Sequence, residues 1–374
     1  MNKILLGTTA LVTAGLVAGP ALASDPLNVT ISGQVITGFY VVDHDNAGVV
    51  EFDDTKVPLV ARNIDINAEG TLDNGLVAGA LLKLELGNDE GNAPQANNAD
   101  FSEVYAYLEG GFGRLEVGAT DGAAYKMHYT SPWFVPGNGV DSPNILNLNT
   151  TGITSRTSTF ALLTEDDNKI SYFTPRLGGF QLGVSYTPDT PINDPLPNGF
   201  GVSAENSSIE EVFEIAANYA GEFGDVEIGV DAFYVTGDAP VAVVGDDPTE
   251  YGFGANLGVM GFTLGGAWYQ SEGLDAPGQN VPDGNEEKEV WTIGLAYGTG
   301  PWTVGVAYLQ AESTDPGGPD DNRENDFLQF GGGYSLGSGV DIGLDIQLAS
   351  GNSGAPGAPD VDSNSAGVVM AVAF

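Results

Sequence analysis

The chain has 374 residues, with 11 Lys and Arg against 51 Asp and Glu, and its formal net charge is −40. A charge of this sign argues against binding to a nucleic-acid backbone, which requires clustered basic residues. Because the chain has no cysteine, disulfides, Cys-ligated metal sites and a thiol nucleophile are all excluded. The 42% apolar content argues against general disorder.

The first predicted element is a signal peptide at residues 1–23. A short positive start at Lys3 precedes an apolar stretch from Ile4 to Ala18, and Ala21-Leu22-Ala23 supplies the small-x-small pattern of signal peptidase sites. The alternative is an N-terminal membrane anchor, which the shortness of the apolar run disfavours. Residues 24–374 contain no run that approaches the ~20 apolar residues of a membrane-spanning helix. We therefore expect an exported chain that does not cross a membrane as helices.

From residue 29 onward, apolar residues alternate with polar residues or glycine, which is the period-2 pattern of a β-strand. The clearest stretches are 29–41, 75–87, 225–236 and 340–349. Strands of roughly 9–13 residues suit a tilted membrane-crossing strand. A soluble β-sandwich is the alternative, but its strands tend to be shorter. The polar face, rich in Gly, Ser, Thr, Gln, Asp and Glu, suits a water-filled interior, so the pattern predicts a transmembrane β-barrel.

The connections between these strands alternate between short and long. The short turns are Thr71–Asn74, Gly110–Gly113, Arg176–Gly179, Gly221–Gly224, Met260–Gly261, Gly298–Pro301 and Gly337–Gly339. The long loops are near 43–56, 88–99, 121–167, 188–208, 237–248, 271–287, 311–324 and 350–363. These connections imply sixteen strands, with the tight turns and long loops at opposite ends as in an outer-membrane barrel.

The C-terminus supplies the closing strand. Apolar residues alternate outward from Ser365 to Phe374, and this stretch ends on an aromatic residue. A closed barrel must pair its last strand with its first, because an open edge in lipid leaves backbone groups unsatisfied. We therefore expect Val29–Val41 to pair with Ser365–Phe374. Aromatic residues also gather at strand ends, as in interfacial girdles: Tyr219, Phe223, Phe262, Trp291, Tyr297, Trp302, Tyr308 and Tyr334.

Four stretches carry a family resemblance: AEGTLDNGL (68–76), GGFGRLEVGATDGAA (110–124), NKISYFTPRLGGFQLGVSYTPD (168–189) and VVMAVAF (368–374). With them, the whole mature chain resembles the general diffusion porins of Gram-negative bacteria, in the alphaproteobacterial style. The resemblance implies an all-β fold, a sixteen-stranded antiparallel transmembrane β-barrel with long external loops and an inward-folded third loop, here 121–167. It also implies an outer-membrane homotrimer.

The same resemblance suggests partners. They are other copies of the chain, outer-membrane lipid and lipopolysaccharide, small hydrophilic solutes, and the barrel-insertion machinery. The terminal aromatic residue, Phe374, resembles the signal that this machinery recognises.

The candidate pore residues are charged residues of the constriction loop and of the wall. They are Asp121, Asp141, Glu165 and Asp166 in the loop, and Arg62, Lys83, Glu85, Arg114 and Glu116 on the strands. In members of this family, acidic loop residues face basic residues of the wall, but this sequence has few basic residues for that wall. Lys83 and Arg114 either line the pore or bridge to neighbouring carboxylates. Asp141 is either a pore residue or a solvated loop-turn residue. Arg62 is in phase with Ile64 and Ile66, near the external end.

The charge imbalance suggests a preference for cations. Only two inward strand positions carry bases, Lys83 and Arg114. Nine carry acids: Glu85, Glu103, Glu109, Glu116, Glu214, Glu227, Asp231, Asp341 and Asp345. A low-dielectric wall of one sign raises the local concentration of counter-ions. Alternatively, the charge only keeps an exported protein soluble. No cofactor is expected, although loop carboxylates at Asp43-His44-Asp45 and from Asp315 to Asp321 could bind Ca²⁺ or Mg²⁺.

Enzyme signatures such as G-x-S-x-G, H-E-x-x-H and G-x-x-x-x-G-K-[ST] are absent from the sequence, so no enzyme is expected. Two function classes remain. The first is a passive channel for ions and small hydrophilic solutes. The second is a substrate-selective channel or an adhesive surface barrel with the same fold. Inward aromatics that could form a sugar track are few: Tyr40, Tyr105, Tyr107, Phe173, Phe233 and Tyr269.

Overall fold

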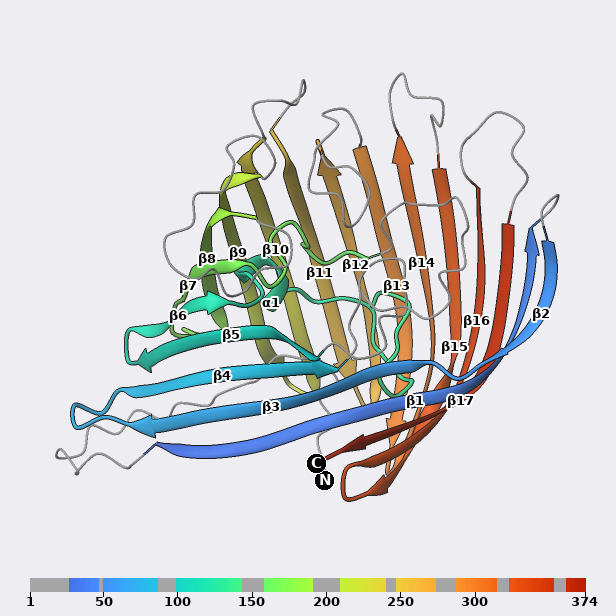
Figure 1. The fold of residues 1–374 in the computed structure, drawn as a ribbon, viewed down its shortest axis with the longest axis horizontal. Helices are drawn as coiled ribbons and strands as arrows, with labels where there is room; N and C mark the ends of the chain where they lie inside the picture. The colour runs from blue at the N-terminus through green and yellow to red at the C-terminus, as the bar shows by residue number, and fades with distance from the viewer. Residues whose placement is uncertain are drawn as a thin grey trace.

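The computed structural model describes residues 27–46, 50–86, 99–142, 158–190, 209–239, 247–273, 287–314, 323–352 and 361–374. The strands form one antiparallel sheet that closes on itself, and one helical turn lies within the ring (Figure 1). The elements are β1 (Asn28–Asn46), β2 (Val50–Lys56), β3 (Leu59–Thr71), β4 (Val77–Leu86), β5 (Ala99–Gly110), β6 (Gly113–Ala119), α1 (Ala123–Lys126), β7 (Asn168–Phe173), β8 (Phe180–Asp189), β9 (Glu210–Phe223), β10 (Val226–Asp238), β11 (Thr249–Val259), β12 (Phe262–Glu272), β13 (Glu287–Thr299), β14 (Trp302–Thr314), β15 (Arg323–Gly337), β16 (Val340–Asn352) and β17 (Val361–Ala373).

The segments β2 and β3 are two halves of one interrupted strand. The strand β1 pairs with both of them, through its C-terminal part with β2 and through its N-terminal part with β3. The interruption contains Pro58, which has no N–H to give to a ladder. The carbonyl of Pro58 accepts hydrogen bonds from Gly38 N at 3.2 Å and Thr37 Oγ1 at 2.9 Å. With β2 and β3 counted together, the barrel has the sixteen strands that the sequence predicted.

The predicted seam between the first and last strands is confirmed. Residues of β1 from Gln34 to Asn46 pair with β17. Phe374 extends this ladder by one residue, since its N–H donates to Gly33 O at 3.0 Å and its carbonyl accepts from Gly33 N at 2.9 Å. A Cβ on Gly33 would lie 2.8 Å from the Phe374 ring, so glycine leaves room for the terminal aromatic.

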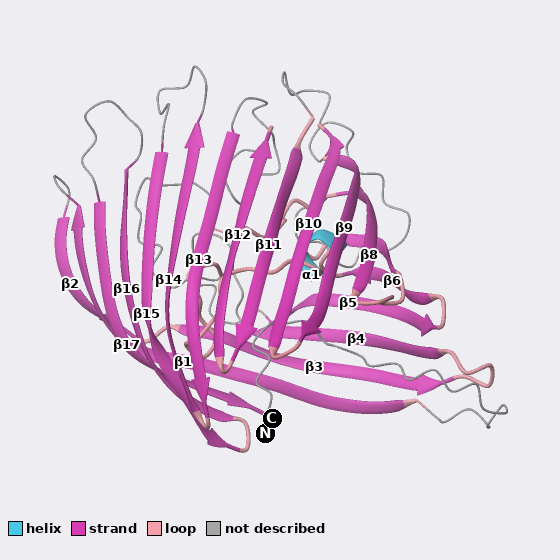
Figure 2. Ribbon diagram, turned by 180° about the vertical axis from the view of Figure 1, so that it is seen from behind, coloured by secondary structure: helices cyan, strands magenta, loops and turns pink. Residues whose placement is uncertain are grey.

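The outer face of the barrel is apolar. Large apolar side chains such as Ile31, Phe39, Phe253 and Ile293 are half or more exposed there, as expected of a surface that meets lipid. Figure 2 shows the short turns at one end of the strands and the long connections at the other, and aromatic rings pair across neighbouring strands toward both ends. The pairs nearer the short turns are Phe180–Tyr219, Phe262–Tyr297 and Trp302–Tyr334, and those nearer the long loops are Tyr234–Tyr251 and Trp291–Tyr308.

The seven short turns lie where the sequence placed them. The predicted loop at 43–56 is wrong, because β1 continues to Asn46 and β2 begins at Val50, so most of this segment is a paired hairpin. The other long loops, apart from 121–167, lie mostly outside the described residues. Among the residues that the structure describes, no helix is long and apolar enough to cross a membrane.

Deletion of Phe374 is expected to lower the amount of barrel in the outer membrane and to leave a protease-sensitive periplasmic chain. The deletion removes both hydrogen bonds to Gly33 and the ring packed over it, at the seam that closes the barrel. Membrane fractionation and heat-modifiable gel mobility would measure the loss. Phe374→Tyr, which keeps the aromatic ring, should insert normally. Normal membrane levels of the truncated chain would contradict the prediction.

Candidate pore constriction

The loop between β6 and β7 lies inside the barrel, where residues 120–142 run along the inner wall. It rests on inward glycines, one on each of eight strands. The contacts are Met127 on Gly183, Tyr129 on Gly229 and Gly254, Thr130 on Gly265, Pro132 on Gly294, Phe134 on Gly305, Val135 on Gly331 and Pro136 on Gly343. We call the eight glycines the glycine track. A side chain at most of these positions would collide with the loop, which therefore lies flat against β8–β16.

Buried carboxylates on the wall accept hydrogen bonds from the loop. Glu214 accepts from Ala124 N at 2.9 Å and from Thr164 Oγ1 at 2.6 Å. Glu250 accepts from the backbone amides of Leu162 and Leu163 at 3.3 and 3.2 Å. These bonds replace the water that the carboxylates lose on burial, and they fix the loop at points on β9 and β11.

Four of the nine acids that the sequence assigned to the open wall are buried and contact the loop. Glu116 and Glu214 are each 4% exposed, Asp231 is 8% exposed, and Asp345 is wholly buried. The expected surplus of pore carboxylates is therefore smaller than the alternation suggested. The sequence pattern gives the inward phase correctly, but it does not show which inward positions the loop covers.

Asp345 on β16 joins the loop to the seam. Its carboxylate accepts from Asn138 Nδ2 of the loop at 2.7 Å and from the Tyr40 hydroxyl of β1 at 2.9 Å. The Tyr40 ring reaches across β17 at Gly367, where a Cβ would meet it. One carboxylate thus contacts both the constriction loop and the first strand.

Asp141 holds the two described parts of the loop together. It is wholly buried, accepts from Thr159 N at 2.8 Å, and also accepts from the hydroxyls of Thr130 and Thr159. Of the readings that the sequence left open, pore residue or solvated turn residue, the described structure shows neither. Asp141 is an internal anchor of the loop.

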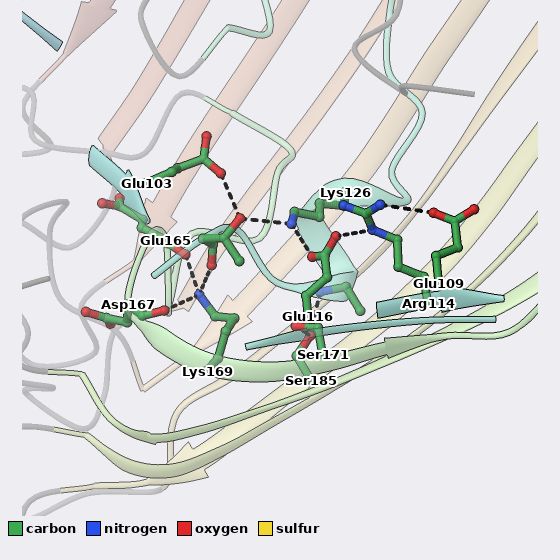
Figure 3. A network of polar contacts seen from close by, with 12 residues as sticks. Glu103, Glu109, Arg114, Glu116, Lys126, Glu165, Asp167, Lys169, Ser171 and Ser185 are labelled. Carbon is green, nitrogen blue, oxygen red and sulfur yellow. Dashed lines mark hydrogen bonds and ion pairs between the residues drawn. The ribbon is translucent and has the colours of Figure 1, made fainter. Parts of the chain in front are cut away.

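Lys169, which the sequence reasoning missed, joins the start of the loop to its end. Its Nζ lies within hydrogen-bond distance of the carbonyls of Glu165 at 2.6 Å and Asp167 at 3.0 Å (Figure 3), and also of those of Thr164 at 3.3 Å and Thr120. The side chain of the predicted pore residue Glu165 is exposed, while its backbone serves this contact. The ammonium group occupies a cage of carbonyl oxygens, as a metal ion would.

The wall formed by β3–β6 carries a chain of alternating charges. Glu109 pairs with Arg114 at 3.0 Å, Arg114 with Glu116 at 2.6 Å, and Glu116 with Lys126 of the loop at 2.6 Å. Thr120 connects Lys126 to Glu103 (Figure 3). Lys83 then bridges Glu103 at 3.2 Å and Glu85 at 3.1 Å. We call this set the charge ladder.

Lys83 and Arg114 bridge to neighbouring carboxylates, which is one of the two alternatives that the sequence left open, and their lining of the pore stays a prediction. Each bridges to two carboxylates, and their side chains remain 28% and 24% exposed. Acids and bases therefore alternate on one wall rather than facing each other across the lumen. Arg62 pairs with Val35, an exposed apolar residue of the outer face, so its phase is outward as the alternation predicted.

Asp121 and Asp166 meet Glu103 at the loop end of the ladder, with one oxygen of each within 4.8 Å of the others. Burial, followed by the charge of Glu103, raises the pKa of Asp121 to about 6. Burial, followed by the charges of Asp121 and Glu103, raises the pKa of Asp166 to about 8. Three carboxylates have the donor chemistry of a Ca²⁺ or Mg²⁺ site, but neighbouring lysines already supply positive charge here.

Two further acids of the open wall were missed. Asp65 and Glu69 lie on β3 in the inward phase; Asp65 is opposite Lys83, and Glu69 accepts from the Tyr107 hydroxyl at 2.6 Å. Alternation with Ile64 and Ile66 already placed them inward. The sequence could also have predicted the glycine track, because its glycines recur at inward positions in the middle of the strands. The contacts of Lys169 could not have been predicted, because backbone carbonyls leave no pattern in the sequence.

A closed antiparallel barrel with an apolar exterior, a polar interior and an internal loop defines an outer-membrane channel protein. A family model described as Gram-negative porin matches residues 7–354. The chain belongs to this family, and its place is the outer membrane of a Gram-negative bacterium. Family and fold together indicate a channel rather than an enzyme.

Solved structures share the fold at low sequence identity. An anion-selective porin from Comamonas acidovorans is 17% identical with a TM-score of 0.59, and the match covers 92% of this chain and 99% of that one. The trimer form of OmpT, an outer membrane protein of Vibrio cholerae, is 13% identical with a TM-score of 0.58, covering 94% and 100%. An uncharacterized protein of Rickettsia felis is 22% identical over 301 residues, covering 63% of this chain and 67% of that protein.

Proposed function

We propose that the protein is a passive channel for ions and small hydrophilic solutes that prefers cations. The channel class follows from the family and the fold; the preference is the further step. The observation that carries it is the charge of the wall that the loop leaves open. This wall and the adjoining loop residue carry five accessible acids (Asp65, Glu69, Glu85, Glu103 and Glu109), the buried Glu116, and three bases (Lys83, Arg114 and Lys126).

The surplus of acids is large enough to matter. Two unit charges 4 Å apart interact by about 1 kcal/mol in water and by about 4 kcal/mol at an effective dielectric of ~20. A narrow aqueous lumen lies between these limits, so even one or two unpaired carboxylates favour cations severalfold. Because salt screens the field to about 10 Å at 0.1 M, the preference should weaken at high salt. The porin from Comamonas acidovorans is described as anion-selective, so the family fold does not itself set the sign.

The test is the zero-current potential of a planar bilayer under a KCl gradient. The wild-type potential should have the sign of a channel that prefers potassium over chloride. The double variant Asp65→Asn/Glu85→Gln should give a smaller potential of the same sign. Glu289→Gln is the matched control, because Glu289 is an exposed acid that bonds to Trp268 on the outer face. A preference for chloride would show that the three bases outweigh the acids.

The same proposal includes processing and assembly. Residues 1–23 are removed on export, leaving 24–374 as the barrel domain, and the mature barrels assemble as a homotrimer. The trimer form of Vibrio cholerae OmpT supports the assembly. Sedimentation of the purified protein in mild detergent should give the mass of three chains, and a monomer would contradict this part of the proposal.

A further inference from the structure

Lys169 on β7 contacts the backbone of the constriction loop rather than its side chains. Its side chain points into the barrel and is 3% exposed. In the described part of the chain, the partners of Nζ are the carbonyl of Thr120 at the start of the loop and those of Thr164, Glu165 and Asp167 at its end. An amine has N–H donors in either protonation state, so these contacts do not depend on its charge. Lys169 therefore holds the main chain on both sides of the loop base.

The end of the loop turns sharply toward Nζ. Asp167 N donates to the Thr164 carbonyl at 2.8 Å, which closes a turn over residues 164–167. Glu165 in this turn has a φ of 30°, in the left-handed region that residues with a side chain rarely adopt. Its carbonyl lies 2.6 Å from Nζ (Figure 3). Because a strained backbone persists only where surrounding contacts hold it, the contact with Lys169 helps to keep the turn in this form.

The backbone that Lys169 holds carries two acids of the loop. Asp121 directly follows Thr120, and Asp166 is the third residue of the turn 164–167. One oxygen of each lies within 4.8 Å of the other and of Glu103 on β5. Within the described residues, both acids interact through charge and not through hydrogen bonds of their own carboxylates. Carboxylates at this distance repel each other, so the main chain must keep the two acids in place.

We propose that Lys169 is a positioning residue for the cation preference of the channel: by binding the backbone on both sides of the loop base, it holds Asp121 and Asp166 beside Glu103. The acids act on the permeating ions, and Lys169 acts through the acids. The inference rests on the proposed function, because the cluster has an electrical role only in a channel that prefers cations.

Two other lysines near the cluster have a different role. Lys83 pairs with two carboxylates of the wall, and Lys126 pairs with one. In the described residues their partners are side chains, whereas the partners of Lys169 are carbonyls of the backbone. Lys83 and Lys126 therefore balance charge, and Lys169 determines where the loop acids lie.

The test removes the amine without changing the length of the side chain. The chain has no cysteine, so Lys169→Cys supplies a single thiol that can be alkylated in urea before the full chain is refolded in detergent. Alkylation with 2-bromoethylamine restores an amine at the end of the side chain. Alkylation with 1-bromopropane gives a side chain of the same length that ends in a methyl group. The two products differ in N–H donors and in charge, but hardly in volume.

Hydrogen exchange with mass spectrometry measures the loop base directly. The aminoethyl product should exchange like wild type in peptides that cover 120–126 and 160–167. The propyl product should exchange about tenfold faster there, because these segments open locally without the amine. The same two alkylations at Lys56→Cys are the matched control, since Lys56 is an exposed lysine of β2, and should leave both peptides unchanged. Equal exchange of the two products at position 169 would overturn the proposal.

Zero-current potentials in a KCl gradient separate positioning from charge. If Lys169 supplied only a positive charge, its loss would strengthen the preference for potassium. Dispersal of the acids should instead make the preference of the propyl product severalfold weaker than that of the aminoethyl product, because a field focused by like charges depends on their proximity. A stronger or unchanged preference would overturn the proposal. A wild type that prefers chloride would contradict the proposed function, while the exchange measurement, which needs no conduction, would still test the contacts of Lys169.

Discussion

Gly254→Ala is expected to lower single-channel conductance severalfold and to make the open channel noisy, while the barrel still folds. A Cβ at this position of β11 would collide with the carbonyl oxygen of Tyr129. That oxygen belongs to the backbone, so no side-chain rotation can relieve the collision. Overpacking of this kind costs about 1–3 kcal/mol, and the loop can avoid the cost only by leaving the wall. Displacement toward the lumen narrows the channel.

The same strand supplies a matched control for this substitution. Gly258 lies on β11 in the same inward phase, and a Cβ there would meet only the Glu227 side chain, at 3.3 Å or more. Gly258→Ala should therefore conduct like wild type. Single-channel recordings of both variants, with heat-modifiable gel mobility to verify folding, measure the difference. Equal conductance of the two variants would show that the glycine track does not seat the loop.

The second large effect is a loss of cation preference as the medium is acidified from about pH 8 to below about pH 6. The pKa of Asp166 is about 8 and that of Asp121 about 6, both raised first by burial. Protonation removes up to two negative charges from the cluster with Glu103. Zero-current potentials at several pH values measure the change. Asp166→Asn should remove the upper part of the titration, and an unchanged potential would place the cluster off the ion path.

The same raised pKa values affect stability with a defined sign. An unfolded aspartate has a pKa of about 3.9, so between about pH 4 and pH 8 the folded chain binds more protons at Asp166 than the unfolded chain does. This contribution to the free energy of unfolding is fully present below about pH 4. It is lost as the pH rises through about 8.

Much of the barrel was readable from the sequence, because a period-2 pattern determines which face each strand residue occupies. The seam between β1 and β17 follows from Phe374 and from the requirement for a closed edge. The prediction of a loop at 43–56 was wrong for a local reason. Asp43 and Asp45 are polar on a strand that extends beyond the apolar band, where polarity no longer distinguishes strand from loop.

The site was less predictable because the loop decides which wall residues meet water. Asp231 and Glu116 are both inward acids, yet one bonds to His128 beneath the loop and the other belongs to the charge ladder. The alternation of apolar and polar residues predicts only that both side chains point inward. The role of Asp141 likewise depends on Thr159, eighteen residues away in the chain, and no short-range pattern contains that pairing.

The shared carboxylate of Asp345 bears on the order of events during biogenesis. It accepts from Tyr40 of the first strand and from Asn138 of the loop, as well as from Gln329 of β15 and Gln347 of β16, and it lies opposite Gly367 of β17. A barrel that sealed before the loop was inside would leave this carboxylate in the open lumen without its loop donor, so the seam contact and the loop contact form more favourably together. Sealing and loop insertion should therefore occur as one cooperative step, and intermediates with a closed wall but an external loop should not accumulate.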